Sequence, residues 1–249
     1  MINTKKTKIA VIGLGYVGLP LAVEFSKKIN VIGYDYNPQR IRELKSGYDR
    51  TNEIRHVGSL LSGKLFFTSV LRDISESNVF IIAVPTPVNK KKQPDLRLLK
   101  KACISISKFI KNNDVIIFES TVYPGTTEEV CVPILEKGSG LYFNKDFYCG
   151  YSPERMNPGD KKHNVTNIKK IVSGSSPKIT RFIASLYKMI VLVGVHKVSS
   201  IKVAEAAKII ENTQRDLNIA LMNELSIIFR MMNLDTNEVI NAASTKWNF

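Results

Sequence analysis

The ten residues VIGLGYVGLP constrain the fold of this chain more than any other stretch. They place Gly13, Gly15 and Gly18 in the spacing G-x-G-x-x-G, after an apolar run and at the start of a helical pattern. In such a turn the first glycine permits the tight bend, the second lets the backbone approach a diphosphate, and the third lets the helix pack on the strand. The diphosphate then meets the amide-rich start of the helix, so we count Tyr16 and Val17 of this turn among the cofactor-binding residues.

An acidic residue stands where an NAD-binding fold requires one. Asp35 lies 22 residues past Gly13, at the end of the next apolar run, VIGYD. A carboxylate there accepts hydrogen bonds from the ribose hydroxyls of NAD and repels the 2′-phosphate of NADP. Motif and carboxylate together predict NAD as the cofactor; a glycine-rich turn without a ligand is the alternative. Arg40, one turn into the next helix, lies either along the adenosine or on an ordinary surface.

Apolar runs rich in β-branched residues alternate with helical patterns along residues 1–198. Runs such as VFIIAV and DVIIF are apolar at nearly every position, which is typical of parallel strands buried on both faces. The alternation predicts an α/β fold with a Rossmann-like, doubly wound parallel sheet, and we assign residues 1–198 to an NAD-binding domain. Strands are expected at Lys8–Ile12, Val31–Asp35, Leu65–Ser69, Val79–Pro85, Val115–Ser120, Phe147–Tyr151, Ile171–Gly174 and Val191–Val195, and helices at Gly15–Lys27, Pro38–Ser46, Asp95–Ile110, Thr126–Lys137 and Pro177–Met189.

Residues 199–249 follow a different pattern. Ser199 to about Met232 is predicted to form one helix of over thirty residues that is apolar around much of its circumference. Such a linker helix packs on several sides, so we expect it to form a homodimer. Asp235 followed by Glu238 resembles a capping box and predicts a further helix. We assign this segment to a central linker and dimerisation region that is incomplete.

Composition argues against several other classes of protein. The net charge is +14, but the lysines are spread in small clusters without interleaved aromatic residues, so we expect no nucleic-acid partner. The apolar run after Lys8 is interrupted by glycines and Pro20 and is too short to span a bilayer, so no membrane association is expected. The three cysteines, Cys103, Cys131 and Cys149, are predicted to be buried thiols in a cytoplasmic protein without a metal site.

Two further loops and one helix face carry candidate site residues. The segment AVPTP places Pro85 and Thr86 beyond one strand, and ESTVYPG places Ser120 and Thr121 beyond another. Ligands of α/β sheets bind at such strand ends, although Pro, Thr and Gly also gather in ordinary turns. In the later helix, Lys208 lies four residues before Asn212 on the same face. By periodicity alone, that pair is typical of a solvated surface.

Five segments give the chain a resemblance to a known family. KIAVIGLGYVGLPLAVEF, VPTPV, ESTVYPGTTEEV, YSPERMNPGD and SSIKVAEAAKIIENTQRDLNIALMNEL together resemble the nucleotide-sugar 6-dehydrogenases, the UDP-glucose/GDP-mannose dehydrogenase family. The nearest branch is that of the UDP-N-acetylhexosamine enzymes (UDP-GlcNAc or UDP-GalNAc) of surface-polysaccharide synthesis. The similarity extends from Lys8 to Phe249, and PERMNPG and AEAAKIIENT are far more specific than the glycine motif.

The resemblance implies a double oxidation of the sugar C6 alcohol to the carboxylate, with reduction of two NAD⁺. It implies a cysteine thiolate that holds the aldehyde as a thiohemiacetal and then as a thioester. Carried onto this chain, Lys208 stabilises the developing oxyanion, and Asn212 holds that oxyanion or a water. Thr121 positions water, and Glu154 acts as general base or holds the hydrolytic water. Arg155 and Asn157 line the sugar nucleotide.

The sequence departs from the family pattern in two respects. Family members continue past KWNF into a loop with the nucleophilic cysteine and then a second α/β domain that binds the nucleotide of the substrate. Neither is present, so we expect this polypeptide alone to bind NAD without completing the four-electron oxidation. Two alternatives remain open: a β-hydroxyacid dehydrogenase, making one hydride transfer with Lys208 and Asn212, or a non-catalytic NAD-binding and dimerisation module.

Overall fold

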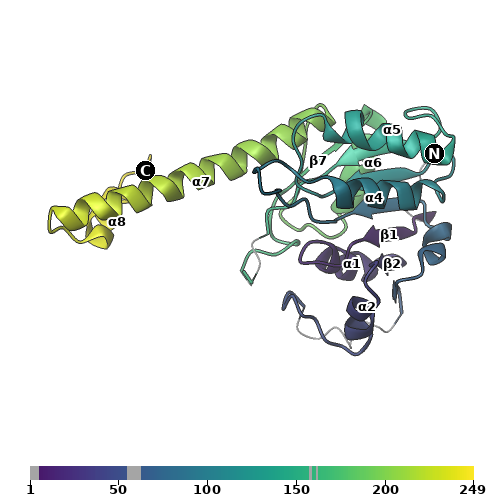
Figure 1. Ribbon diagram of the computed structural model, residues 1–249, viewed down its shortest axis with the longest axis horizontal. Coiled ribbons are helices and arrows are strands. Elements are labelled where there is room, and N and C mark those ends of the chain that lie inside the picture. Colours follow the sequence, from purple (N-terminus) through teal and green to yellow (C-terminus); the bar gives the residue numbers. More distant parts are fainter. Residues whose placement is uncertain (1–5, 55–62, 157–158, 161) are drawn as a thin grey trace. The chain divides into compact units, whose positions relative to one another are not determined.

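The computed structural model describes residues 6–54, 63–156, 159–160 and 162–249 (Figure 1). The chain divides into two compact units, Met1–Ala206 and Ala207–Phe249, which are taken in turn. The first unit is built on an eight-stranded sheet in the order β3-β2-β1-β4-β5-β6-β7-β8. Its strands are β1 (Ile9–Ile12), β2 (Val31–Tyr34), β3 (Leu65–Thr68), β4 (Val79–Ile82), β5 (Val115–Phe118), β6 (Tyr148–Tyr151), β7 (Lys170–Gly174) and β8 (Val195–Lys197).

Helices cover both faces of this sheet. They are α1 (Gly18–Ser26), α2 (Pro38–Lys45), the short 3-10 helix η2 (Leu71–Glu76), α4 (Arg97–Ser107), the π-helical turn η3 (Thr126–Cys131), α5 (Val132–Ser139) and α6 (Pro177–Tyr187). Side chains alternate along each strand, so Val11 packs with α1, α2 and α6, whereas its neighbour Ile12 packs with α4 and α5. Burial on both faces explains why these strands are apolar at almost every position. The predicted Rossmann-like, doubly wound fold is confirmed.

The parallel register brings four chain segments to one edge of the sheet. Ile12 pairs with Tyr34 on one side and with Ile82 on the other, and Ile82 pairs with Phe118. The residues that follow these strand ends therefore lie side by side beyond the carboxyl edge, where ligands of open α/β sheets bind.

Three local predictions need correction. β8 begins at Val195 rather than Val191, because Val191 still closes the end of α6 through its N–H to the Tyr187 carbonyl (2.9 Å), and Gly194 then turns the chain at φ +97°. β7 runs antiparallel to β6, so the sheet is mostly rather than wholly parallel. The predicted helix after Gly125 opens as the π-helical turn η3, because Pro133 has no N–H to continue the regular ladder.

The second unit contains most of α7 (Ile201–Met231) and the whole of α8 (Thr236–Ala243). The predicted capping geometry is present, since the Asp235 side chain accepts a hydrogen bond from the Glu238 N–H at 2.8 Å. Within the single chain, α7 exposes a series of large apolar side chains, including Ile210, Leu217, Leu221, Ile228 and Met231. Of the helices in the described residues, none is long and apolar enough to cross a membrane.

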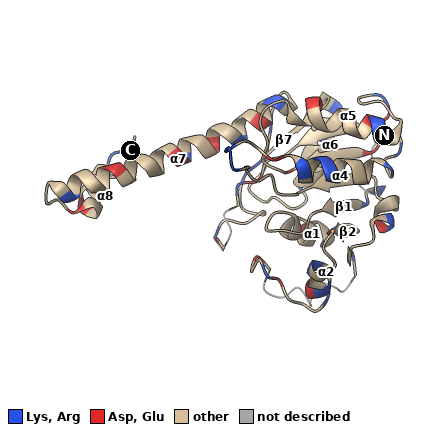
Figure 2. Ribbon diagram, in the orientation of Figure 1, with Lys and Arg blue, Asp and Glu red and all other residues tan. Residues whose placement is uncertain are grey.

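Charged side chains are distributed over many elements of the chain. Figure 2 shows Lys and Arg on α2, on α4 and at several loops, with acidic residues beside them on α2. Several of these charges are paired at the surface, as Lys27 is with Glu24 and Arg97 with Asp95. Such exposed pairs contribute little stability, so the charges that matter for the site are the buried ones.

Candidate functional site

The glycine turn between β1 and α1 is shaped by close backbone contacts. Gly13 has φ +93°, and a Cβ there would lie 2.9 Å from the Ala83 carbonyl oxygen. A Cβ on Gly18 would lie 1.8 Å from the Gly13 carbonyl oxygen, so only glycine lets α1 start this close to the strand end. A Cβ on Gly15, in contrast, would meet no atom within 4 Å. The open space at Gly15 is where a diphosphate could approach the backbone.

A cleft of about 540 Å³ opens beside this turn, which we call the Asp35 cleft. The Asp35 carboxylate accepts hydrogen bonds from the backbone N–H groups of Leu14 and Asn37, both at 2.9 Å. These bonds fix the carboxylate at the end of β2 next to the glycine turn. The cleft is lined mainly by apolar atoms, and α4 contributes one wall; its residues include Gly13, Gly15, Tyr34, Asp35, Arg40, Val84, Pro85, Leu98 and Ala102.

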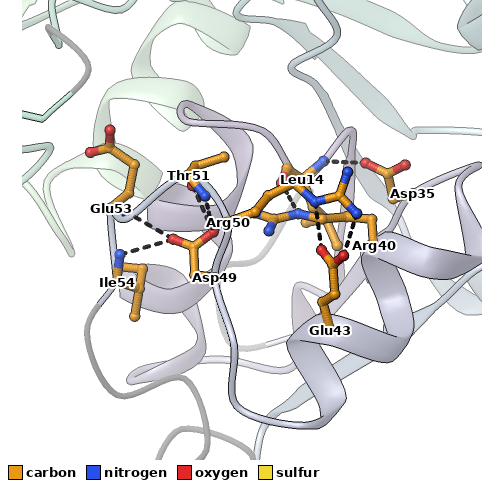
Figure 3. A network of polar contacts seen from close by, with 9 residues as sticks. All are labelled: Leu14, Asp35, Arg40, Glu43, Asp49, Arg50, Thr51, Glu53 and Ile54. Atoms are coloured by element: carbon orange, nitrogen blue, oxygen red, sulfur yellow. Dashed lines mark hydrogen bonds and ion pairs between the residues drawn. The ribbon is translucent and has the colours of Figure 1, made fainter.

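Arg40 belongs to a buried network and not to the surface (Figure 3). Only 5% of Arg40 is exposed; its Nε donates to the Leu14 carbonyl oxygen at 2.9 Å and its Nη2 to Asp49 at 2.8 Å. The surface alternative for Arg40 is therefore wrong. Its Nη1 is buried without a hydrogen-bond partner among the described residues, and Arg40 lines the Asp35 cleft. A buried donor left unpaired is costly, so an acceptor on a bound ligand would fit there.

Asp49 organises the loop after α2. Besides Arg40, its carboxylate accepts hydrogen bonds from the backbone N–H groups of Thr51, Glu53 and Ile54, each at 3.0 Å (Figure 3). Arg40 thus connects this loop to the glycine turn, and Thr51 lines the Asp35 cleft.

A second cleft of about 330 Å³, the Glu154 cleft, adjoins the first. The two share the lining residues Gly15, Ala83, Val84 and Pro85, so they lie on either side of a common wall at the carboxyl edge of the sheet. The structure brings together here most of the residues predicted for the cofactor and the chemistry: Gly15, Tyr16, Val17, Pro85, Thr86, Ser120, Thr121 and Glu154.

The hydroxyl groups at this cleft join its two loops. Thr86 Oγ1 donates to the Thr121 carbonyl oxygen at 2.5 Å, and Ser120 Oγ donates to the Val84 carbonyl oxygen at 2.6 Å. The Tyr151 hydroxyl holds Ser120 from below through its carbonyl oxygen at 3.1 Å. The protons of Thr86 and Ser120 are thus used for loop geometry, and their oxygens remain as acceptors.

Glu154 is a buried carboxylate rather than a surface one. It is 8% exposed, lines the Glu154 cleft and accepts a hydrogen bond from the Met156 N–H at 2.8 Å. Arg155 is half-buried beside it, and the predicted Asn157 lies outside the described residues. A carboxylate held at the wall of a cleft could accept a proton from a bound alcohol or water.

A further buried carboxylate, Glu119, is the first residue of ESTVYPG and was not among the predicted site residues. Its side chain is 1% exposed and also lines the Glu154 cleft. Lys170 Nζ donates to its Oε2 at 2.5 Å, and the Tyr187 hydroxyl donates to its Oε1. Burial raises the pKa of Glu119, and the Lys170 ammonium acts in the opposite direction. A charged residue directly after a buried strand was the available signal, but its partners lie 51 and 68 residues away.

The two predicted residues on α7, Lys208 and Asn212, differ in burial. Lys208 is 2% exposed, whereas Asn212 is exposed, so a uniformly solvated face does not describe these two positions. Both residues belong to the second unit.

The cysteines lie in the core. All three are buried and free, and none lines the Asp35 or the Glu154 cleft. A hydrogen bond with Cys131 and burial raise the pKa of Cys103, and burial raises the pKa of Cys149, so these thiols are poor nucleophiles. Within the described residues, no group of His, Cys, Asp and Glu side chains is arranged to hold a metal ion.

Comparison with known proteins finds matches over nearly the whole chain. The NAD binding domain of the UDP-glucose/GDP-mannose dehydrogenase family matches residues 7–191, and the central domain of that family matches residues 202–249. The chain is 60% identical over 245 residues to UDP-N-acetyl-D-glucosamine 6-dehydrogenase of Pseudomonas aeruginosa, covering 98% of this chain and 58% of that protein. It is 57% identical over 249 residues to the Salmonella typhi protein of the same name, covering 100% and 59%.

A solved structure gives a similar result. The UDP-D-ManNAc dehydrogenase from Pyrococcus horikoshii superposes with a TM-score of 0.91 at 36% identity, covering 98% of this chain and 59% of that one. The chain therefore spans 58% to 59% of the length of these relatives.

Proposed function

Because the chain belongs to the UDP-glucose/GDP-mannose dehydrogenase family, with NAD as cofactor, we propose that it serves in the oxidation of a UDP-N-acetylhexosamine. The reaction converts the C6 hydroxyl of the sugar to a carboxylate. The two relatives named for UDP-N-acetyl-D-glucosamine, at 60% and 57% identity, support this substrate class. The product, a UDP-linked uronic acid, would serve surface-polysaccharide synthesis in the cytoplasm.

The observation that carries the proposal is that two clefts adjoin at the carboxyl edge of the sheet and share the residues Gly15, Ala83, Val84 and Pro85. The Asp35 cleft offers a carboxylate for ribose hydroxyls, the Arg40 side chain in its wall, and the open space at Gly15 for a diphosphate. The adjoining Glu154 cleft then receives the nicotinamide end and the reacting sugar carbon. Bound NAD⁺ supplies a hydride acceptor; the residues of this chain hold it and move the protons.

Each proposed catalytic residue has a task set by its chemistry. Glu154 takes the proton of the alcohol or of the hydrolytic water, and Thr121 positions that water beside it. Lys208 balances the negative charge that develops on the sugar oxygen, and Asn212 holds that oxygen or a water. Arg155 and Asn157 bind the sugar nucleotide.

The 249-residue chain by itself is proposed to bind NAD without completing the double oxidation. The complete reaction needs a thiolate that carries the substrate between its two steps. The three thiols are buried away from both clefts, which supports this limit.

Calorimetry and product analysis test the proposal together. Titration with NAD⁺ is expected to release heat and to raise the melting temperature of the purified chain. Incubation with NAD⁺ and UDP-GlcNAc or UDP-GalNAc is expected to give no uronic acid. The absence of any NAD⁺ binding at millimolar concentration would overturn the cofactor site, and formation of uronic acid would overturn the proposed limit.

The two alternatives give different NADH yields. A β-hydroxyacid dehydrogenase forms one NADH for each hydroxyacid consumed, whereas the complete UDP-sugar reaction forms two. A purely binding module gives NAD⁺ affinity and no NADH with either class of substrate. The family match favours the UDP-sugar assignment over the first alternative.

A homodimer through α7 is also proposed. The exposed apolar side chains of the second unit, among them Ile210, Leu217, Leu221, Ile228 and Met231, would be covered in that dimer. Sedimentation at micromolar concentration is expected to give twice the 28.0 kDa mass of the chain, and a monomer would contradict the proposal.

A further inference from the structure

A buried ion pair lies at the wall of the Glu154 cleft and has no part in the proton transfers described above. Glu119 follows β5, Lys170 begins β7 and Tyr187 ends α6. Their exposed fractions are 1%, 6% and 0%. Lys170 Nζ donates to one oxygen of Glu119, the Tyr187 hydroxyl donates to the other, and Lys170 Nζ lies 5.5 Å from the centre of the Tyr187 ring. We call these residues the Glu119 set.

Burial of such a pair is hard to explain by stability alone. Removing two charges from water is costly, and an apolar group of similar volume often serves the core equally well. Glu119 nevertheless has a donor on each carboxylate oxygen, and the set joins two strands and a helix. Hydrogen bonds to both oxygens hold the Glu119 carboxylate in one orientation. A catalytic site needs neighbouring side chains that are held in this way, because they determine where the catalytic carboxylate lies.

Lys170 connects the set to the loop that carries Glu154. Its Nζ makes a second hydrogen bond, at 3.1 Å, to the carbonyl oxygen of Pro153, the residue directly before Glu154. Ser152, one residue earlier, is held by its N–H to the Phe118 carbonyl (2.9 Å) and by its Oγ to the Ile171 carbonyl (2.8 Å). The chain entering Glu154 is thus fixed to both β5 and β7.

The far side of Glu154 completes the arrangement. Its Oε2 accepts a hydrogen bond from the Met156 N–H at 2.8 Å. The hydrogen-exchange rate of the Met156 amide therefore reports whether the Glu154 carboxylate stays in this position. Glu119 and Glu154 line the same cleft. Lys170 is paired with the first carboxylate and also holds the loop of the second through the Pro153 carbonyl oxygen.

We propose that Glu119, Lys170 and Tyr187 are positioning residues that hold the Glu154 carboxylate at the cleft. Lys170 acts through the Pro153 carbonyl, and Glu119 and Tyr187 fix the orientation of Lys170. The inference rests on the proposed function only in that Glu154 is taken as the catalytic base there. The positioning itself is a property of the chain without any nucleotide.

Amide hydrogen exchange of ¹⁵N-labelled full chain, measured without nucleotide, tests the inference. K170M removes the bond to Pro153, and the exchange rate at Met156 is expected to rise by about 10- to 100-fold, as for a lost charged hydrogen bond. Y187F removes one hydroxyl, and about a fivefold rise is expected. Exchange at Phe80 and Ile81 in β4 reports global opening. Because K170M also lowers the unfolding free energy, Met156 is compared with β4 in the double variant E119Q/K170M, where the stability is largely restored. K169M, at the exposed neighbouring lysine, is the matched control and should leave Met156 unchanged.

A double variant separates positioning from stability. E119Q/K170M removes both charges, so it should recover much of the unfolding free energy lost in K170M. Exchange at Met156 should nevertheless stay fast, because the bond to Pro153 is still missing. If Met156 remains protected in both the double variant and Y187F, or if its exchange merely follows that of β4, the inference is overturned. NAD⁺ titration of the unaltered chain tests the proposed function separately, so the two can fail independently.

Discussion

Arg40 Nε and the Leu14 carbonyl oxygen are joined by a 2.9 Å hydrogen bond that connects α2 to the glycine turn, 26 residues earlier in the chain. The same guanidinium bonds Asp49, its Nη1 has no hydrogen-bond partner among the described residues, and Arg40 lines the Asp35 cleft. One side chain therefore supports the glycine turn and anchors the loop after α2.

R40M should weaken both folding and cofactor binding. The substitution leaves Asp49 buried without its cation, which typically costs about 3–5 kcal/mol of unfolding free energy. NAD⁺ affinity should fall as well, because the glycine turn loses the hydrogen bond that supports it at Leu14. Denaturant unfolding and calorimetry measure the two effects, with R42M, at an exposed arginine of the same helix, as the control. Equal behaviour of the two variants would contradict this role.

Alanine at two glycines of the turn should separate binding from folding. A methyl group at Gly15 meets no protein atom within 4 Å, so G15A should melt within a few degrees of the unaltered chain. The methyl would occupy the space of the diphosphate, and overpacking of about 1–3 kcal/mol corresponds to a loss of NAD⁺ affinity of roughly 5- to 150-fold. G18A should instead melt far lower, because its Cβ would lie 1.8 Å from the Gly13 carbonyl oxygen. Equal melting temperatures would show that this packing argument fails.

D35N should reduce the affinity for NAD⁺ and also the preference of the chain for NAD⁺ over NADP⁺. Both Asp35 oxygens accept backbone N–H groups, from Leu14 and Asn37, so an amide must direct its NH₂ group at one of these donors. An amide also offers the ribose hydroxyls one acceptor oxygen fewer, and loss of one such ligand bond should weaken NAD⁺ binding by about tenfold, equal to 1.4 kcal/mol. The carboxylate charge that repels a 2′-phosphate is lost as well. Calorimetry with both nucleotides measures the ratio, and D216N, on the exposed surface of α7, should match the unaltered chain.

D114N should stabilise the chain above neutral pH. Burial raises the pKa of Asp114 from 3.8 to about 6, against one hydrogen bond from the Lys111 N–H at 2.7 Å. The folded-state pKa lies above the unfolded one, so the contribution of Asp114 to stability is present below pH 3.8 and is lost as pH rises through about 6. The variant should gain on the order of 1–3 kcal/mol relative to the unaltered chain at pH 8, and little at pH 4. Urea unfolding at pH 4 and pH 8 measures the stability gain of D114N. An equal gain at both pH values would show that the raised pKa of Asp114 is not its cause.

Local patterns in the sequence were sufficient for much of the fold. The glycine spacing requires the turn at Gly13, because only residues without a Cβ fit the contacts with Ala83 and α1. Continuous apolar runs require strands buried on both faces, and Asp235 with Glu238 requires a helix start. These features depend on neighbours within a few residues or on a simple period, so they can be predicted from the sequence alone.

The buried charges were decided by the tertiary structure alone. Four charged residues occupy sequence positions, in loops or near the ends of elements, that are usually exposed, yet all four are buried: Arg40, Glu119, Glu154 and Lys170. Their surroundings come from elements far apart in the chain: Lys170 and Tyr187 lie 51 and 68 residues beyond Glu119. The antiparallel direction of β7 is likewise set by its partner strand. A single sequence determines which residues can turn, pair or pack, whereas the free energy of a charge depends on which distant groups replace its water, and only the assembled sheet specifies those.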